Sequence, residues 1–262
     1  MRKMLVGAFA LGFVACVTSA ANAQNLLTNG NLDQTVATVI VDNAPPGPGV
    51  EDFFLPKPQA WVNEGSRAIT GPYEDEMSSE PWAGPAPTPV TADGSGLPGP
   101  DGCNGPDCAV FFKPFSGDLL TNGAATGHLY QDVPASPGLL YTLTGWAGAE
   151  ANALMTGAEI ALEFLNAGGS VIGGDVVNLL PTLYVDNGEA FDYKQYTASA
   201  VAPAGTALAR ARASMIGATS NPLGGGQAFV IDDFTLTAVP EPASLVMAGL
   251  SLVAAIGLRR RG

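Results

Sequence analysis

Apolar and polar residues alternate along most of the chain after residue 108. Residues 127–133, 139–147 and 158–165 each show a period of two, which is typical of half-buried β-strands. Shorter strand candidates, most of them bounded by Gly, Pro or Asn, are residues 109–112, 171–172, 196–202, 207–216 and 228–237. No amphipathic helix of useful length stands out between the termini, so the pattern predicts an all-β, two-layer sandwich.

The alternation also assigns the faces of individual strands. It places Leu129, Gln131 and Val133 on one side of residues 127–133, and His128, Tyr130 and Asp132 on the other. It places Ile160, Leu162 and Phe164 opposite Glu159, Ala161, Glu163 and Leu165. The apolar sets predict the core side of each strand.

The first half of the chain is less regular. Residues 26–27 and the β-branched run 36–41 indicate strands, with a tight turn at Asn29-Gly30 between them. Thirteen of the 21 prolines fall in residues 42–107, where strand candidates are limited to 59–62 and 67–70. We expect residues 71–107 to form a long Pro/Gly-rich loop insertion.

Both termini carry apolar runs. Residues 1–23 have the basic start, apolar stretch and Ala21-Asn22-Ala23 cleavage site of a signal peptide. A lipoprotein lipidated at Cys16 is the weaker alternative. At the other end, Ala243–Leu258 would form a helix about 24 Å long, which spans a bilayer only with thinning or snorkelling. Residues 24–239 would then be one sandwich domain, and residues 240–262 a transmembrane tail.

The exported part is strongly acidic. Residues 24–239 hold 23 acidic and six basic residues, a net charge near −17, without a Lys/Arg cluster. Nucleic acid is therefore a poor partner.

After removal of the signal peptide two cysteines remain, and Cys103 and Cys108 flank an Asn-Gly-Pro-Asp turn sequence. Export favours a local disulfide between them, because a metal site would need further ligands nearby.

Residues for catalysis are scarce. His128 is the only histidine, and no Gly-x-Ser-x-Gly or Gly-rich phosphate loop occurs. Glu159 and Glu163 lie on one side of a strand, so a glycosidase-type carboxylate pair stays open, although a solvated polar face is the simpler interpretation. Exposed aromatic residues could stack on sugar rings, and the candidates are Trp82, Trp146 and Tyr184.

The C-terminal sequence resembles a known sorting signal. Pro240-Glu241-Pro242, the apolar run and Arg259-Arg260-Arg261 follow one another as in PEP-CTERM tails. That resemblance implies recognition, and cleavage near Pro-Glu-Pro, by an exosortase-type membrane protease. Before processing, the tail would sit in the inner membrane with the arginines on the cytoplasmic side. An ordinary C-terminal anchor is the alternative.

The body resembles galactose-binding-like and carbohydrate-binding β-sandwich modules. The opening NLLTNGNLD and the later segments HLYQDVPASPGLLYTLTGWA, AVAPAGTALARARASM and AFVIDDFTLTAV carry that likeness. It implies a jelly-roll sandwich, a buried Trp61, and a structural Ca²⁺ held by Asp33 and by Asp232 or Asp233. Hydrogen bonding of these carboxylates at a strand end is the alternative to calcium.

These observations predict an exported, non-catalytic protein of the cell surface or extracellular matrix, bound to or associated with exopolysaccharide. Two alternatives remain: an extracytoplasmic glycan hydrolase that uses a carboxylate pair, and a purely structural surface protein.

Overall fold

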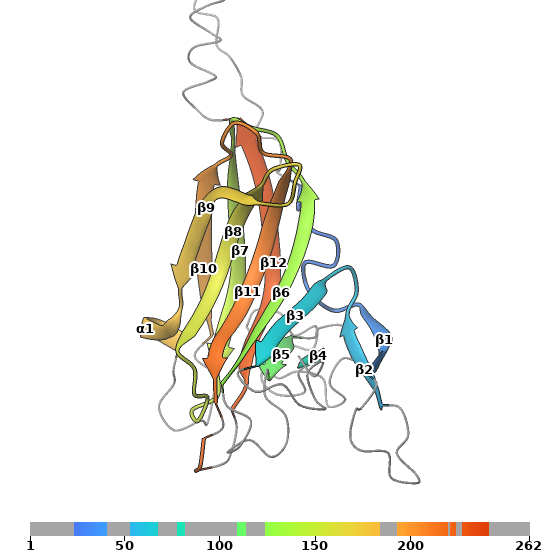
Figure 1. Ribbon diagram of the computed structural model, residues 1–262, viewed down its shortest axis with the longest axis vertical. Coiled ribbons are helices and arrows are strands. Elements are labelled where there is room, and N and C mark those ends of the chain that lie inside the picture. Colours follow the sequence, from blue (N-terminus) through green and yellow to red (C-terminus); the bar gives the residue numbers. More distant parts are fainter. Residues whose placement is uncertain are drawn as a thin grey trace, which may run out of the picture.

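A computed structural model describes residues 24–40, 53–67, 78–81, 109–113, 124–183, 193–219, 221–223 and 227–240 (Figure 1). The strands are β1 (Thr35–Ile40), β2 (Phe53–Pro58), β3 (Val62–Arg67), β4 (Ser78–Pro81), β5 (Val110–Lys113), β6 (Ala125–Pro134), β7 (Leu139–Ala149), β8 (Gly157–Leu165), β9 (Val171–Asn178), β10 (Lys194–Val201), β11 (Leu208–Ala218) and β12 (Phe229–Pro240). One helical turn, α1 (Leu180–Leu183), follows β9. The predicted signal helix, disulfide and transmembrane helix lie outside these residues, as do Trp82 and Tyr184.

The strands form two five-stranded antiparallel sheets and a separate β1–β2 hairpin. Sheet 1 has the order β10-β7-β12-β5-β4, and sheet 2 has the order β3-β6-β11-β8-β9. Within them β5 pairs with β12, β6 with β11, β7 with β10 and β8 with β9. Such pairing is that of one long hairpin rolled up across two sheets, so the predicted jelly-roll sandwich is confirmed.

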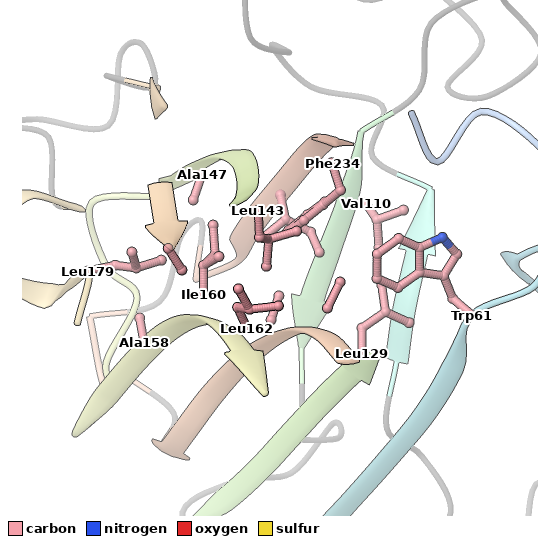
Figure 2. Close-up of a cluster of buried hydrophobic side chains, with 14 of the residues drawn as sticks. Trp61, Val110, Leu129, Leu143, Ala147, Ala158, Ile160, Leu162, Leu179 and Phe234 are labelled. Atoms are coloured by element: carbon pink, nitrogen blue, oxygen red, sulfur yellow. The ribbon is translucent and has the colours of Figure 1, made fainter. Parts of the chain in front are cut away.

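The core fills the space between the two sheets (Figure 2). Leu129 of β6 and the β8 residues Ile160, Leu162 and Phe164 are fully buried, as their alternation predicted. Sheet 1 contributes Leu143 and Phe234 from the other side. Trp61 is also buried and meets the ring of Phe234 edge-on, with the ring centroids 5.5 Å apart. The predicted core position of Trp61 is therefore correct.

The N-terminal segment closes one side of the sandwich by hydrogen bonds rather than as a strand. Leu26 N–H donates to the Leu236 carbonyl of β12 (2.8 Å), and Phe234 N–H donates to the Gly30 carbonyl (2.7 Å). Across the core, Thr28 exchanges two backbone hydrogen bonds of 2.8 Å with the Gln131 side chain of β6. These bonds explain why a glutamine occupies a core-facing position. The expected strand at residues 26–27 is wrong, because single bonds replace a ladder there.

Other differences concern strand limits. Residues 62–67 form the single strand β3, where the sequence suggested two short candidates on either side. The strand predicted at residues 171–172 continues to residue 178 as β9. The short strand β4 lies inside the predicted loop insertion, where it pairs with β5 at the edge of sheet 1. Edge strands tolerate proline, which is consistent with Pro81 at the end of β4.

Candidate ligand-binding face

The outer side of sheet 2 carries a band of polar and charged side chains, which we call the polar face. Its central members, from three adjacent strands, are Tyr130 and Asp132 of β6, Arg210 and Arg212 of β11, and Glu159 and Glu163 of β8. The strand register places them side by side: Arg212 lies opposite Tyr130 on one neighbour and Ala161 on the other, and Arg210 lies opposite Asp132 and Glu163. Because alternate residues of the same strands fill the core, these side chains must face outward.

Arg212 is the centre of the first cluster. Its guanidinium donates to Glu163 Oε1 through Nε (3.0 Å) and Nη2 (2.8 Å), and to Glu159 Oε2 through Nη1 (3.2 Å). Its side chain is 13% exposed, and that of Glu163 is 14% exposed. Glu159 and Glu163 therefore share one arginine, which offsets the repulsion between two carboxylates on the same side of β8.

Arg210 is the centre of the second cluster. Its Nε and Nη2 donate to the two carboxylate oxygens of Asp132 at 2.6 and 2.8 Å, a bidentate pair. The guanidinium carbon also lies 3.8 Å from the ring centroid of Tyr130. The Tyr130 hydroxyl donates to Glu64 Oε1 at 2.8 Å. Burial, together with the hydrogen bond to Glu64, raises the pKa of Tyr130 above 10.0. The phenol stays protonated, and Arg210 at the ring and Glu64 at the hydroxyl fix the position of the side chain.

His128 and Ser214 lie beside the first cluster, with His128 Nδ1 2.7 Å from Ser214 Oγ. Burial, with the nearby Arg212 charge, lowers the pKa of His128 below 6.5. The serine of this pair is not exposed as a nucleophile would need to be. Ser214 is fully buried and also accepts from Arg212, and its strand pairs on both sides, with His128 and with Glu159. Backbone N–H groups there serve the ladders, so they are not free to act as oxyanion donors.

The predicted calcium residues lie where the N-terminal segment meets β12. A β-bulge interrupts the β12–β7 register between Asp232 and Thr235, and Asp233 has a φ of 51°. The bulge cancels the expected alternation: Asp232 lies on the side of Val230, away from the main core, and its Oδ1 accepts the Asp233 N–H (2.7 Å). Burial raises the pKa of Asp233 above 3.8.

This region does not show the donor set of a dedicated metal site. Asn31 donates to Asp33 Oδ2, so that carboxylate already has a local partner. Among the described residues, no group of three or more His, Cys, Asp or Glu side chains could hold a metal ion. Backbone hydrogen bonds join the two segments directly. Calcium at Asp33, Asp232 and Asp233 stays a prediction.

Of the three predicted glycan-binding aromatics, the structure describes Trp146. This residue lies on the outer side of sheet 1, half-buried, between Gln195 of β10 and Asp232 of β12 in the register. It is therefore on the opposite side of the molecule from the polar face. The structure does not bring Trp146 together with Tyr130.

Residues 238–261 match the PEP-CTERM protein-sorting motif. The chain carries a sorting tail. The PEP-CTERM motif marks a protein that is exported and sorted through its C-terminus, as the sequence predicted. Its first residues belong to the sandwich, because β12 ends at Pro240. No helix in the described part of the chain is long and apolar enough to cross a membrane, and the predicted span at 243–258 lies outside that part.

Several solved structures are similar to this chain, with TM-scores below 0.5. They include TmCBM61 in complex with β-1,4-galactotriose (16% identity, TM-score 0.42, covering 83% of this chain and 100% of that one). The enzymatically active domain of bacteriophage CBA120 tailspike protein 4 is another (10% identity, TM-score 0.44, 82% of this chain and 21% of that one). A carbohydrate-binding module of the β-sandwich superfamily is a third (11% identity, TM-score 0.40, 68% and 56%). No curated protein sequence is similar to this chain. These likenesses describe the fold alone.

Sequence reasoning assigned sides to four central members of the polar face but found neither its two arginines nor the face as a whole. Strand alternation correctly placed His128, Tyr130 and Asp132 on one side, and Glu159 and Glu163 on one side. The two arginines were not singled out, because only the register of β11 between β6 and β8 shows that they join both sets. A usable signal was present in the pattern Arg-x-Arg-x-Ser of residues 210–214, three polar residues on one side of a strand whose other side is alanine.

Proposed function

We propose that this protein is an exported, non-catalytic protein of the cell surface or extracellular matrix that binds a polysaccharide on its polar face. Before processing, residues 243–258 hold it in the inner membrane, with Arg259, Arg260 and Arg261 on the cytoplasmic side. An exosortase-type protease acts near Pro240-Glu241-Pro242. The bound polymer is the host's exopolysaccharide, and the protein is released into the matrix that this polymer forms.

One observation carries this proposal: the guanidinium, carboxylate and phenol groups of the polar face hold one another in place. Both arginines are ion-paired, and Tyr130 is held between Arg210 and Glu64. Sugar hydroxyls bind well to carboxylates and guanidinium groups, and sugar rings stack on aromatic faces. Since these groups already hold one orientation, binding costs little side-chain entropy.

The shape of the site favours a polymer over a small ligand. The polar face is the open surface of a five-stranded sheet, and adjacent strands lie about 4.8 Å apart, so the face is roughly 19 Å wide. A row of residues crosses all five strands through Val62, Tyr130, Arg212, Ala161 and Val176. Several sugar rings of one chain can lie along such a row.

The arrangement of the two glutamates supports binding over hydrolysis. A glycosidase needs one carboxyl group that stays protonated to act as general acid. Glu159 and Glu163 instead both accept hydrogen bonds from the same Arg212 guanidinium, so each carboxylate already serves as a partner of that cation. Release of reducing sugar from a polysaccharide by the purified protein would show that the non-catalytic assignment is wrong.

Affinity electrophoresis of the exported protein in gels containing the host's own exopolysaccharide tests the proposal. We expect retardation that Tyr130→Ala weakens at least tenfold in Kd, equivalent to about 1.4 kcal/mol. Thr197→Ala, an exposed residue on sheet 1, is the matched control and should bind normally. Loss of binding in Trp146→Ala with normal binding in Tyr130→Ala would place the site elsewhere. No binding of the unaltered protein to any polysaccharide would favour a purely structural role.

A further inference from the structure

The sorting tail leaves the sandwich at one end of its long axis, which we call the tail end. Pro240, the last residue of β12, pairs with Leu139 at the start of β7. In sheet 2, Leu208 pairs with Pro134 and Leu165, and Leu165 pairs with Val171. Ala135 N–H donates to the Ala207 carbonyl (3.0 Å) and Ala202 N–H to the Leu139 carbonyl (2.9 Å). The tail end therefore consists of the three turns 135–138, 166–170 and 202–207, at the top of Figure 1.

The tail end carries no charge. Residues 24–32, 134–149, 164–174, 195–209 and 234–240, which form this end and the strands leading to it, contain no Asp, Glu, Lys or Arg. In the whole chain 13% of residues are charged, and the net charge is −13. The nearest charged side chains on sheet 2 are Asp132 and Arg210, which pair with each other. The charged side chains of the described residues therefore lie away from these three turns.

Apolar side chains are exposed at this end. Val171 is 55% exposed, Val201 40% and Val239 40%. Ile172, next to Val171, is 37% exposed and lies near the β10–β11 turn, where a Cβ on Gly205 would be 3.9 Å from it. Four of the nine exposed large hydrophobic residues in the described part of the chain thus lie at this charge-free end, which suits an apolar or interfacial partner.

The chain itself shows what the partner is. Three Cα–Cα steps separate Pro240 from Ala243, the first residue of the apolar run, so they are at most about 11 Å apart. The headgroup layer on each side of a bilayer is roughly 5–8 Å thick. When residues 243–258 lie in the membrane, Pro240 is held within about 11 Å of the hydrocarbon boundary, at or just above the headgroup layer. The N-terminal segment runs antiparallel to β12, since Leu26 bonds to Leu236, so Gln24 also leaves the sandwich towards this end.

We propose that the sandwich, while its tail is attached, docks end-on onto the bilayer, with the turns 135–138, 166–170 and 202–207 in the headgroup layer. The proposal rests on the membrane insertion of residues 243–258 proposed above. The three turns contain no carboxylate to repel anionic lipid, and Glu241, which follows Pro240, is the one acidic residue between the sandwich and the apolar run. Val171, Val201 and Val239 lose water contact there. The strands then run away from the membrane, and the polar face points sideways, open to a polymer.

Depth-dependent fluorescence quenching tests the proposal. The chain with its tail, with Cys16, Cys103 and Cys108 replaced by Ser, carries a single NBD-labelled cysteine and is reconstituted in phosphatidylcholine vesicles containing brominated lipid. Labels at Ala167→Cys and Ala204→Cys report the turns of the tail end. Leu223→Cys, an 84% exposed residue in the segment that follows β11 at the other end, is the matched control. Ser251→Cys reports insertion of the tail.

We expect quenching at positions 167 and 204 to exceed that at position 223 at least threefold, and to fall to the control value when residues 241–262 are removed. Equal, weak quenching at 167, 204 and 223 together with strong quenching at 251 would overturn end-on docking alone. Weak quenching at 251 would overturn the membrane insertion, and with it the docking that rests on it. Quenching at 223 above that at 167 and 204 would show that the opposite end faces the bilayer.

Discussion

Replacement of Arg212 by Met should destabilise the protein strongly, because it leaves two carboxylates on β8 without their shared partner. Arg212 makes three hydrogen bonds to Glu159 and Glu163, of 2.8 to 3.2 Å. Removing one member of a buried ion pair costs about 3–5 kcal/mol. Glu159 is 27% exposed and can turn towards water, so we expect a loss of about 2–3 kcal/mol in the free energy of unfolding. That loss corresponds to a fall in Tm of roughly 5–10 °C for a protein of this size.

Urea unfolding followed by tryptophan fluorescence measures this loss, with the unaltered protein as reference. A triple variant, Arg212→Met with Glu159→Gln and Glu163→Gln, is the control, since it removes the carboxylate repulsion while keeping the size of the side chains. We expect it to recover more than half of the lost stability. A single variant within about 0.5 kcal/mol of the unaltered protein, or a triple variant no more stable than the single one, would refute the reasoning.

Three further predictions concern other parts of the chain. Gly30→Ala puts a Cβ too close to the Phe234 carbonyl oxygen, so the free energy of unfolding should fall by about 2–3 kcal/mol. The control Gly168→Ala, in an exposed turn, should change it by less than about 0.5 kcal/mol. Equal effects of the two substitutions would contradict the close packing at β12. The pKa of His128 is lowered, so its contribution to stability is present above pH 6.5 and is lost as pH falls through the folded-state pKa. NMR titration of this single imidazole should show the lowered pKa, and His128→Asn should remove the associated loss of Tm. If calcium binds at Asp33, a chelator and Asp33→Ala should each lower Tm; an unchanged Tm in both would eliminate the site.

The sequence predicted the strands of the second half of the chain and the faces that they present. Alternation works there because one side of a strand is more buried than the other, as β6 shows. In β8 the sides are less distinct, because Ala161 and Leu165 on the outer side are also buried. The jelly-roll order came from family resemblance, because alternation carries no information about which strands are neighbours. For the same reason the polar face could not be predicted: its ion pairs depend on the register of β11 between β6 and β8.

Local irregularities also escaped prediction. The bulge after Asp232 shifts the alternation, so that Phe234 joins Ile231 in the main core, and no turn residue marks the bulge in the sequence. The N-terminal segment was expected to contain a strand, but Asn25 pairs with β12 through its side chain: Nδ2 donates to the Phe234 carbonyl (3.0 Å), and Oδ1 accepts from Leu236 N–H (2.9 Å). Where a side chain makes the hydrogen bonds that a neighbouring backbone would otherwise make, the sequence shows no alternating pattern that reveals the pairing.

The central claim is that a polysaccharide binds on the outer side of sheet 2. Amide chemical-shift mapping with soluble fragments of the host's exopolysaccharide tests it most directly, because each strand reports separately. The account predicts that the shifted signals cluster on Tyr130, Arg210, Arg212 and their neighbours on β6, β11 and β8, with sheet 1 unchanged. Shifts confined to sheet 1 or to the loops, with those three residues unmoved at saturation, would contradict it.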